Sequence, residues 1–363
     1  MQKTIGILAI LLVAQVVFAV GMSFTGPSLT AVRPDTPLLE LAENAVDRLT
    51  IEGSDNQQLA LSRQGEEWVL PEKGNFPADQ TRIDRLLGQL RGLKRGLAVA
   101  TTEGAQKRFR VSDDAFERRV TLSRGDETLS KLYLGTSPGM RRVHARTSND
   151  DAVYTVGFGI YDAPVNTEDW EDKSVLQISR GEIEKIILAD LMLNSVPANG
   201  QGVTSGQGDN KSPAKTTWSS DAMAESETVN QASANALAEK LAGLRIDAVL
   251  GSTVKPEYGL EDPELVIGLQ PKGGEELEYR LGKHENGNDY VLKASSRPEY
   301  FRLPGYAGDA LLEAASREQL VEAMSTVSEA TDERKTFPEL VDSIPVESSD
   351  ESDHGNANEE ALH

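Results

Sequence analysis

Two stretches of the chain decide the fold: residues 79–92 read DQTRIDRLLGQLRG, and residues 230–243 read NQASANALAEKLAG. Leu86 of the first stretch aligns with Leu237 of the second, and the neighbouring leucines align at the same shift of 151 residues. In both stretches the aligned leucines recur at the spacing of the apolar stripe of a helix. Each stretch starts with Asp or Asn, which cap helix N-termini well, and ends with Gly, where helices often stop. We therefore predict two related amphipathic helices.

The sequence on either side of the two stretches recurs as well. Trp68 precedes the first stretch as Trp218 precedes the second, and residues 116–135 align with residues 263–282, both ending in Leu-Gly. Repetition of flanks and helix at one approximate shift indicates an internal duplication. Each copy is long enough to bury a core of its own, so we predict two tandem homologous domains.

Each predicted domain consists of several short strands, one helix and then more strands. The segments SRGDE (residues 123–127) and QPKGGE (residues 270–275) place Gly between alternating apolar runs, which is typical of hairpin turns. The order lacks the regular strand–helix alternation of a doubly wound fold. The predicted fold class is therefore α+β: two tandem homologous domains, each a mostly antiparallel sheet with one main helix packed on it, after an N-terminal transmembrane helix.

The N-terminal segment is apolar from Ile5 to Met22, with Gln15 as its only strongly polar residue and Lys3 before it. A run of this length can just cross a bilayer and exceeds the usual core of a signal peptide. We expect an uncleaved anchor, and a cleaved signal is the alternative. Positive residues favour the cytoplasmic side, so Lys3 stays inside and the bulk of the chain is exported.

Changes of composition set the expected boundaries, because Pro-rich, Gly/Ser/Asn-rich and acidic stretches do not build a core. The predicted segments are a signal anchor or transmembrane helix (1–23), a linker (24–42), a first α+β repeat (43–157), a linker (158–181), a second α+β repeat (182–305) with a flexible insert (197–215), a C-terminal helical segment (306–330) and a disordered acidic tail (331–363).

No residue pattern points to catalysis. The chain has no cysteine, which excludes disulfides, thiolate metal sites and a cysteine nucleophile. His144 and His284 do not occupy matching positions in the two copies, and neither has the spacing of metal ligands. The Asp and Glu residues are too numerous for any pair to be chosen as general acid and base. We expect no catalytic residue, no cofactor and no metal.

Charge is distributed unevenly along the chain. The whole sequence carries a formal charge of −21, yet residues 82–146 hold fifteen Lys and Arg against seven Asp and Glu. One interpretation is a solvated surface of dispersed charge; the other is a basic face for an anionic partner. Nucleic acid is not expected, because the exported chain is acidic and this region lacks stacking aromatics. The candidate residues of the basic face are Arg82, Arg85, Arg91, Lys94, Arg95, Arg108, Arg110, Arg141 and Arg142.

The order of these features resembles an uncharacterised bacterial family, the domain of unknown function 4340. The resemblance covers the first copy and its exit nearly end to end, and the second copy more weakly. It is carried by the N-terminal apolar segment and by residues 46–53, 66–94, 99–122, 132–147, 151–156 and 169–179. Such families look like membrane-anchored envelope proteins that work beside gliding-type ABC transporter components. The resemblance thus implies a single-pass protein of the bacterial inner membrane with its bulk in the periplasm, and it carries over no catalytic residue.

The function expected is that of a non-enzymatic accessory or binding subunit of an envelope complex, associated with an ABC-type transporter. Its partners would be the membrane, through the N-terminal helix, and a membrane protein; the oligomeric state stays open. A ligand would sit in a cleft between the two domains, or a partner strand would join an open sheet edge. The alternatives are an envelope glycan or peptide hydrolase that uses carboxylates, and a structural spacer.

Overall fold

The computed structural model describes residues 15, 36–42, 45–197, 216–285 and 287–324. Four predicted segments therefore lie wholly or largely outside the described residues: the transmembrane helix, the first linker, the insert and the acidic tail. Among the residues that are described, no helix is long and apolar enough to cross a membrane. The described part is an α+β structure with two large antiparallel sheets and few helices.

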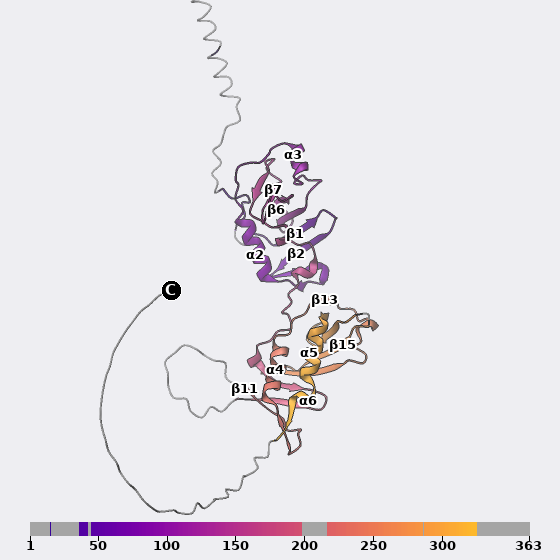
Figure 1. The fold of residues 1–363 in the computed structure, drawn as a ribbon. Coiled ribbons are helices and arrows are strands. Elements are labelled where there is room, and N and C mark those ends of the chain that lie inside the picture. Colours follow the sequence, from indigo (N-terminus) through magenta and orange to yellow (C-terminus); the bar gives the residue numbers. More distant parts are fainter. Residues whose placement is uncertain (1–14, 16–35, 43–44, 198–215, 286, 325–363) are drawn as a thin grey trace, which may run out of the picture. The chain divides into compact units, whose positions relative to one another are not determined.

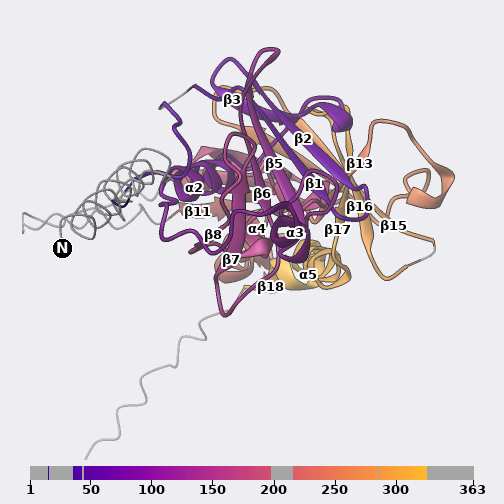
Figure 2. The same ribbon diagram turned by 90° about the horizontal axis from the view of Figure 1, so that it is seen from above.

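The first sheet has eight antiparallel strands in the order β4-β3-β2-β1-β5-β6-β7-β8. Figure 2 shows β2, β1, β5 and β6 of this sheet side by side. Side chains alternate along β1, where Leu49 and Ile51 are buried. The strands are β1 (Arg48–Gly53), β2 (Gln58–Gln64), β3 (Glu67–Leu70), β4 (Phe76–Pro77), β5 (Arg118–Arg124), β6 (Glu127–Leu134), β7 (Val143–Thr147) and β8 (Tyr154–Val156).

Helix α2 (Gln80–Arg91) packs on this sheet (Figure 1). The predicted leucines Leu86 and Leu90 are buried, and Ile83, which was not part of the predicted stripe, is buried with them. The Asp79 side chain accepts a hydrogen bond from the backbone N–H of Arg82, which confirms the predicted N-cap. A shorter helix, α3 (Glu103–Arg108), and the 3-10 turns η1 (Pro71–Lys73), η2 (Ile160–Asp162), η3 (Thr167–Trp170) and η4 (Arg180–Glu182) complete the first half and the connection to the second.

The second sheet also has eight antiparallel strands, in the order β11-β10-β9-β14-β15-β16-β17-β13. They are β9 (Ile183–Ile187), β10 (Met192–Pro197), β11 (Thr216–Ser219), β13 (Ala248–Gly251), β14 (Leu265–Pro271), β15 (Leu277–Lys283), β16 (Tyr290–Ala294) and β17 (Tyr300–Leu303), with the 3-10 turn η5 (Pro256–Tyr258) before β14. Helix α4 (Gln231–Ala242) contacts α5 (Gly305–Ala315) and the short α6 (Arg317–Leu320). The stretch predicted to be helical from residue 306 thus holds these helices and then a strand, β18 (Val321–Ala323), which pairs with β12 (Glu227–Val229).

The two sheets share a common strand order. Six neighbouring strands of the first sheet, β2-β1-β5-β6-β7-β8, correspond in their order along the chain to six of the second, β10-β9-β14-β15-β16-β17. In both halves a Gln at the first turn of the helix holds the backbone of a Trp. Gln80 accepts from the N–H of Trp68 at 3.1 Å and donates to its carbonyl at 3.1 Å. Gln231 does the same with Trp218, at 2.8 and 2.7 Å.

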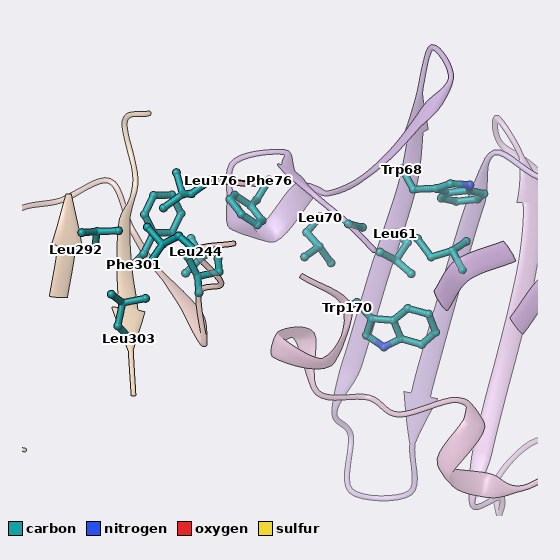
Figure 3. Close-up of a cluster of buried hydrophobic side chains, with 14 of the residues drawn as sticks. Leu61, Trp68, Leu70, Phe76, Trp170, Leu176, Leu244, Leu292, Phe301 and Leu303 are labelled. Atoms are coloured by element: carbon teal, nitrogen blue, oxygen red, sulfur yellow. The ribbon is translucent and has the colours of Figure 1, made fainter. Parts of the chain in front are cut away.

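Buried apolar side chains of both sheets belong to one continuous cluster. Phe76 of β4 and Phe301 of β17 meet with ring centroids 6.3 Å apart (Figure 3). The guanidinium of Arg297 lies 5.3 Å from the Phe76 ring, over its face. An aromatic pair of this kind adds about 0.5–1.5 kcal/mol beyond its buried area. The two sheets therefore share apolar packing.

Candidate functional site

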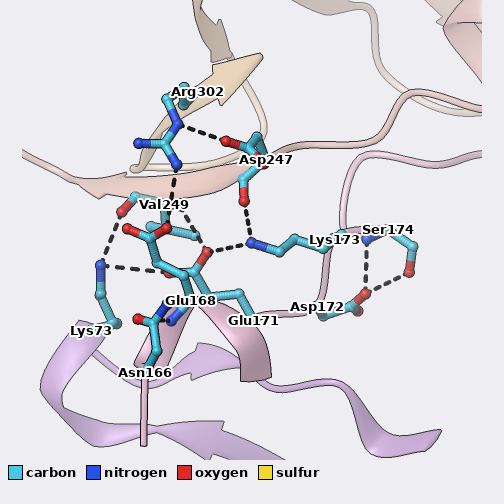
Figure 4. A network of polar contacts seen from close by, with 10 residues as sticks. All are labelled: Lys73, Asn166, Glu168, Glu171, Asp172, Lys173, Ser174, Asp247, Val249 and Arg302. Carbon is cyan, nitrogen blue, oxygen red and sulfur yellow. Dashed lines mark hydrogen bonds and ion pairs between the residues drawn. The ribbon is translucent and has the colours of Figure 1, made fainter. Parts of the chain in front are cut away.

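A buried carboxylate lies where the connection between the two sheets meets β13. Glu171, directly after η3 (Thr167–Trp170), has a side chain that is 0% exposed. Its Oε2 accepts a hydrogen bond from the backbone N–H of Val249 at 3.0 Å and another from Lys173 Nζ at 3.1 Å. Lys73 Nζ lies 3.5 Å from its Oε1 (Figure 4). One anion from the connection thus joins a lysine of the first half to a strand of the second.

Further polar contacts surround this carboxylate. Lys73 Nζ also donates to the carbonyl of Val249 at 3.1 Å. Lys173 donates to the backbone carbonyl of Asp247, whose carboxylate accepts from Arg302 Nε at 2.7 Å. The same guanidinium reaches Glu168 of η3 at 3.3 Å (Figure 4). We call this set of contacts the Glu171 junction. A buried charge is costly unless it is paired and hydrogen-bonded. Here Oε2 of Glu171 is hydrogen-bonded, whereas Oε1 has the ion pair with Lys73 but no hydrogen bond among the described residues.

The nine basic residues predicted from the sequence fall on two sets of elements. Five lie on α2 or just after it, and four lie on α3 or its end and on the β6–β7 loop. In the first set, Arg82 stacks over the ring of Trp170 at 5.3 Å, and Arg95 lies 3.9 Å from Asp150. These arginines therefore serve partly to hold the fold.

The second set includes the tip of the β6–β7 loop. Arg110 pairs with Glu117 at 3.0 Å, whereas Arg141 and Arg142 are exposed. The backbone N–H of Thr136 donates to the carbonyl of Phe109, which brings the end of α3 next to the start of this loop. The structure thus brings the end of α3 next to the β6–β7 loop, and these two elements carry the four basic residues.

A hollow of about 690 Å³ opens between the β6–β7 loop and the segment that follows β8. Its lining includes Val143, Phe158 and Ile160. Met140 and Tyr161 also line it and are 91% and 87% exposed. This hollow combines apolar walls with two arginines at its rim, which is the mixture of groups found in binding sites.

A second hollow, of about 510 Å³, contains carboxylates and so bears on the hydrolase alternative. Arg119 makes a two-pronged ion pair with Glu52, and Arg146 pairs with Asp113. A hydrogen bond from Tyr133, together with Arg146, lowers the pKa of Asp113. A glycosidase acid needs a carboxyl with a raised pKa, so this shift has the wrong sign for that role. Within the described ranges no cluster of three or more His, Asp or Glu side chains could hold a metal.

Sequence reasoning found Arg141 and Arg142 but missed Met140, Tyr161 and Glu171. An apolar side chain is usually buried, and a glutamate usually exposed, so nothing in the one-dimensional pattern marks these three as exceptions. Only the tertiary arrangement reveals them.

The sequence of the chain matches one known protein family. The sequence model of the family described as Domain of unknown function (DUF4340) matches residues 68–263, which is more than half of the chain. The chain belongs to the DUF4340 family. The DUF4340 match starts in β3 and ends just before β14, so it covers parts of both sheets rather than the first half alone. No curated protein and no solved structure matches this DUF4340 chain.

Proposed function

We propose that this DUF4340 protein is a membrane-anchored accessory or binding subunit of an envelope complex, without catalysis of its own, and that it associates with an ABC-type transporter. The observation that carries the proposal is the rim of the 690 Å³ hollow, where Met140 and Tyr161 are 91% and 87% exposed beside two arginines. Large apolar side chains gathered on a surface are costly in water, and they are typical of sites where another molecule binds.

The proposed location is the bacterial inner membrane, with a single span and the bulk of the chain in the periplasm. The support is the apolar run from Ile5 to Met22 behind Lys3, together with membership in DUF4340. We also propose that the two halves arose by internal duplication. The common strand order and the paired Gln–Trp contacts support this origin.

The hydrolase alternative gains no support from the carboxylates that the structure groups together. Glu52 and Asp113 are both paired with arginines, and the pKa of Asp113 is lowered. A spacer would need no exposed apolar rim, so the Met140–Tyr161 region favours binding over that alternative as well.

Crosslinking in intact cells tests the proposed function. The full chain carries a C-terminal affinity tag, cells are treated with a membrane-permeable crosslinker, and the membrane proteins that co-purify are identified. We expect transporter components to be recovered, and to be lost when residues 1–23 are replaced by a cleavable signal that releases the chain into the periplasm. Recovery of no membrane protein from a chain that fractionates with the inner membrane would contradict the proposal.

A further inference from the structure

We infer that the 690 Å³ hollow docks a peptide segment of the partner protein, in which a large apolar side chain is flanked by acidic residues. The inference rests on the proposed function and names the partner's chemistry. The docking surface consists of Met140, Arg141, Arg142, Ile160 and Tyr161, with Phe158 at its base. Below it is called the Met140 surface.

The apolar part of the Met140 surface is open to an occupant. Met140 and Tyr161 are almost fully exposed to water, whereas Phe158, which also lines the hollow, is only 2% exposed. Covering a Met or Phe-sized side chain contributes about 1.5–3 kcal/mol. A concave site of this volume lies within the range of about 300–1,000 Å³ that is common for ligand pockets. An apolar side chain of the occupant would enter the hollow, where it could cover these exposed groups.

The charged part requires an occupant of negative charge. Within the described ranges, the guanidinium groups of Arg141 and Arg142 have no hydrogen-bond, ion-pair or ring partner. Glu117 is the only carboxylate in the lining, and Arg110 already pairs with it at 3.0 Å. The guanidinium groups of Arg141 and Arg142 are therefore available to carboxylates of an occupant, with which arginine forms bidentate hydrogen bonds.

The loop holds these groups in place before anything binds. Ser137 Oγ lies within hydrogen-bond distance of two carbonyls of the loop, 2.6 Å from that of Gly139 and 2.7 Å from that of Arg142. Arg141 has a φ of +52°, in the left-handed region where a residue with a side chain is strained by about 1 kcal/mol or more. Strain of this kind concentrates at functional sites, and a preformed loop lowers the cost of binding.

A protein segment fits these observations better than a lipid surface. Protein interfaces are enriched in aromatic residues, Met and Arg and depleted in Lys, Glu and Asp, and the Met140 surface has that composition. Recognition of anionic lipid uses clusters of about four to eight cations, whereas only Arg141 and Arg142 are free here. A bilayer surface also offers nothing to fill a hollow.

Selection from a random twelve-residue peptide library displayed on phage tests the inference. The target is the full chain in nanodiscs of neutral phosphatidylcholine, and the affinity of each enriched peptide is measured by fluorescence anisotropy. We expect enriched peptides to combine acidic residues with a large apolar residue. Their affinity should fall at least about tenfold in R141E/R142E and in Tyr161→Ser, and also as salt is raised.

The matched control is R48E/R245E, because the side chains of both arginines are exposed, have no partner among the described residues and give the same change of net charge. It should bind the peptides like the wild type. Arg141→Asn provides a second test, since Asn tolerates positive φ. This variant should be at least as stable against unfolding as the wild type and yet bind the peptides more weakly. These exposed substitutions are checked for folding by circular dichroism.

Four results of the peptide and vesicle experiments would overturn the inference. They are the absence of enriched peptides, enrichment of peptides without acidic residues, equal loss of affinity in the R48E/R245E control, and binding to phosphatidylglycerol vesicles that needs Arg141 and Arg142 while peptide binding does not. Concentration-dependent dimerisation that R141E/R142E abolishes would assign the surface to a second copy and would also overturn it. If transporter components still co-purify in cells when peptides fail, the proposed function stands and only the docking chemistry is wrong.

Discussion

The carboxylate of Glu171 and the backbone N–H of Val249, 78 residues apart in the chain, are joined by a buried hydrogen bond of 3.0 Å. Lys73 of η1, between β3 and β4, reaches both residues, through an ion pair with the carboxylate and a hydrogen bond to the Val249 carbonyl. The carboxylate therefore contacts three segments of the chain: it accepts hydrogen bonds from Lys173 and Val249 and forms an ion pair with Lys73. Removal of this carboxylate should therefore lower the stability of the whole described structure.

Glu171→Ala should lower the free energy of unfolding by about 3 kcal/mol. The substitution leaves Lys73 and Lys173 without their buried partner and the amide of Val249 without its acceptor. Because the two lysine side chains are 29% and 23% exposed, water relieves part of the cost. Urea unfolding followed by tryptophan fluorescence measures the change.

The control for this substitution is Glu168→Ala, in the same junction. Its side chain is 43% exposed and pairs with a partly exposed Arg302, so the loss should stay below about 1 kcal/mol. If the two substitutions lowered the free energy of unfolding equally, the burial of Glu171 would not make its contacts more stabilising than those of Glu168.

Gly135, directly after β6, and Gly282, inside β15, should both resist substitution. A Cβ on Gly135 would stand 2.0 Å from the carbonyl oxygen of Phe109, and one on Gly282 would stand 2.4 Å from that of Tyr258. A backbone carbonyl cannot move away from the added Cβ as easily as the end of a flexible side chain can. Gly135→Ala and Gly282→Ala should therefore each lower the free energy of unfolding by more than about 2 kcal/mol. Thermal unfolding measures both.

Gly88→Ala, inside α2, is the control for these two substitutions. No atom lies within 4 Å of the added Cβ, so the change should raise stability by about 0.5–1 kcal/mol. If Gly135→Ala or Gly282→Ala unfolded at the wild-type temperature, the close approach described here would be wrong, and one support for the duplication would disappear.

Much of each half follows from the sequence, because local signals and burial agree there. Asp79 and Asn230 cap their helices as predicted, and the aligned Gln80 and Gln231 make equivalent contacts. The strand β18 (Val321–Ala323) was not predicted, since its partner β12 lies about 90 residues upstream and pairing at that distance leaves no local pattern. The exposure of Met140 and Tyr161 and the burial of Glu171 escaped prediction for the same reason.

Tyr279→Phe should change the response of the protein to alkaline pH. Burial raises the pKa of the Tyr279 phenol above its ordinary value of 10.0. A raised pKa in the folded state contributes stability that is fully present below pH 10 and is lost as pH rises through the folded value. The Phe variant should therefore match the wild type at pH 7 and lose less stability above pH 10.

Urea unfolding at pH 7 and at pH 11 compares the two proteins. Tyr306→Phe, at a ring that is 79% exposed, serves as the control and should leave the alkaline loss unchanged. A Tyr279→Phe variant that loses as much stability at pH 11 as the wild type would refute the effect of burial.

Photo-crosslinking in living cells tests the central claim, that this chain binds a membrane-protein partner through the Met140 surface. A photoreactive benzoylphenylalanine replaces Tyr161 in one strain and Tyr306, on α5, in another; the two side chains are 87% and 79% exposed. The account predicts an adduct with an inner-membrane protein from position 161 that R141E/R142E removes, and no such adduct from position 306. An absence of adducts at position 161, or the same adduct from both positions, would contradict it.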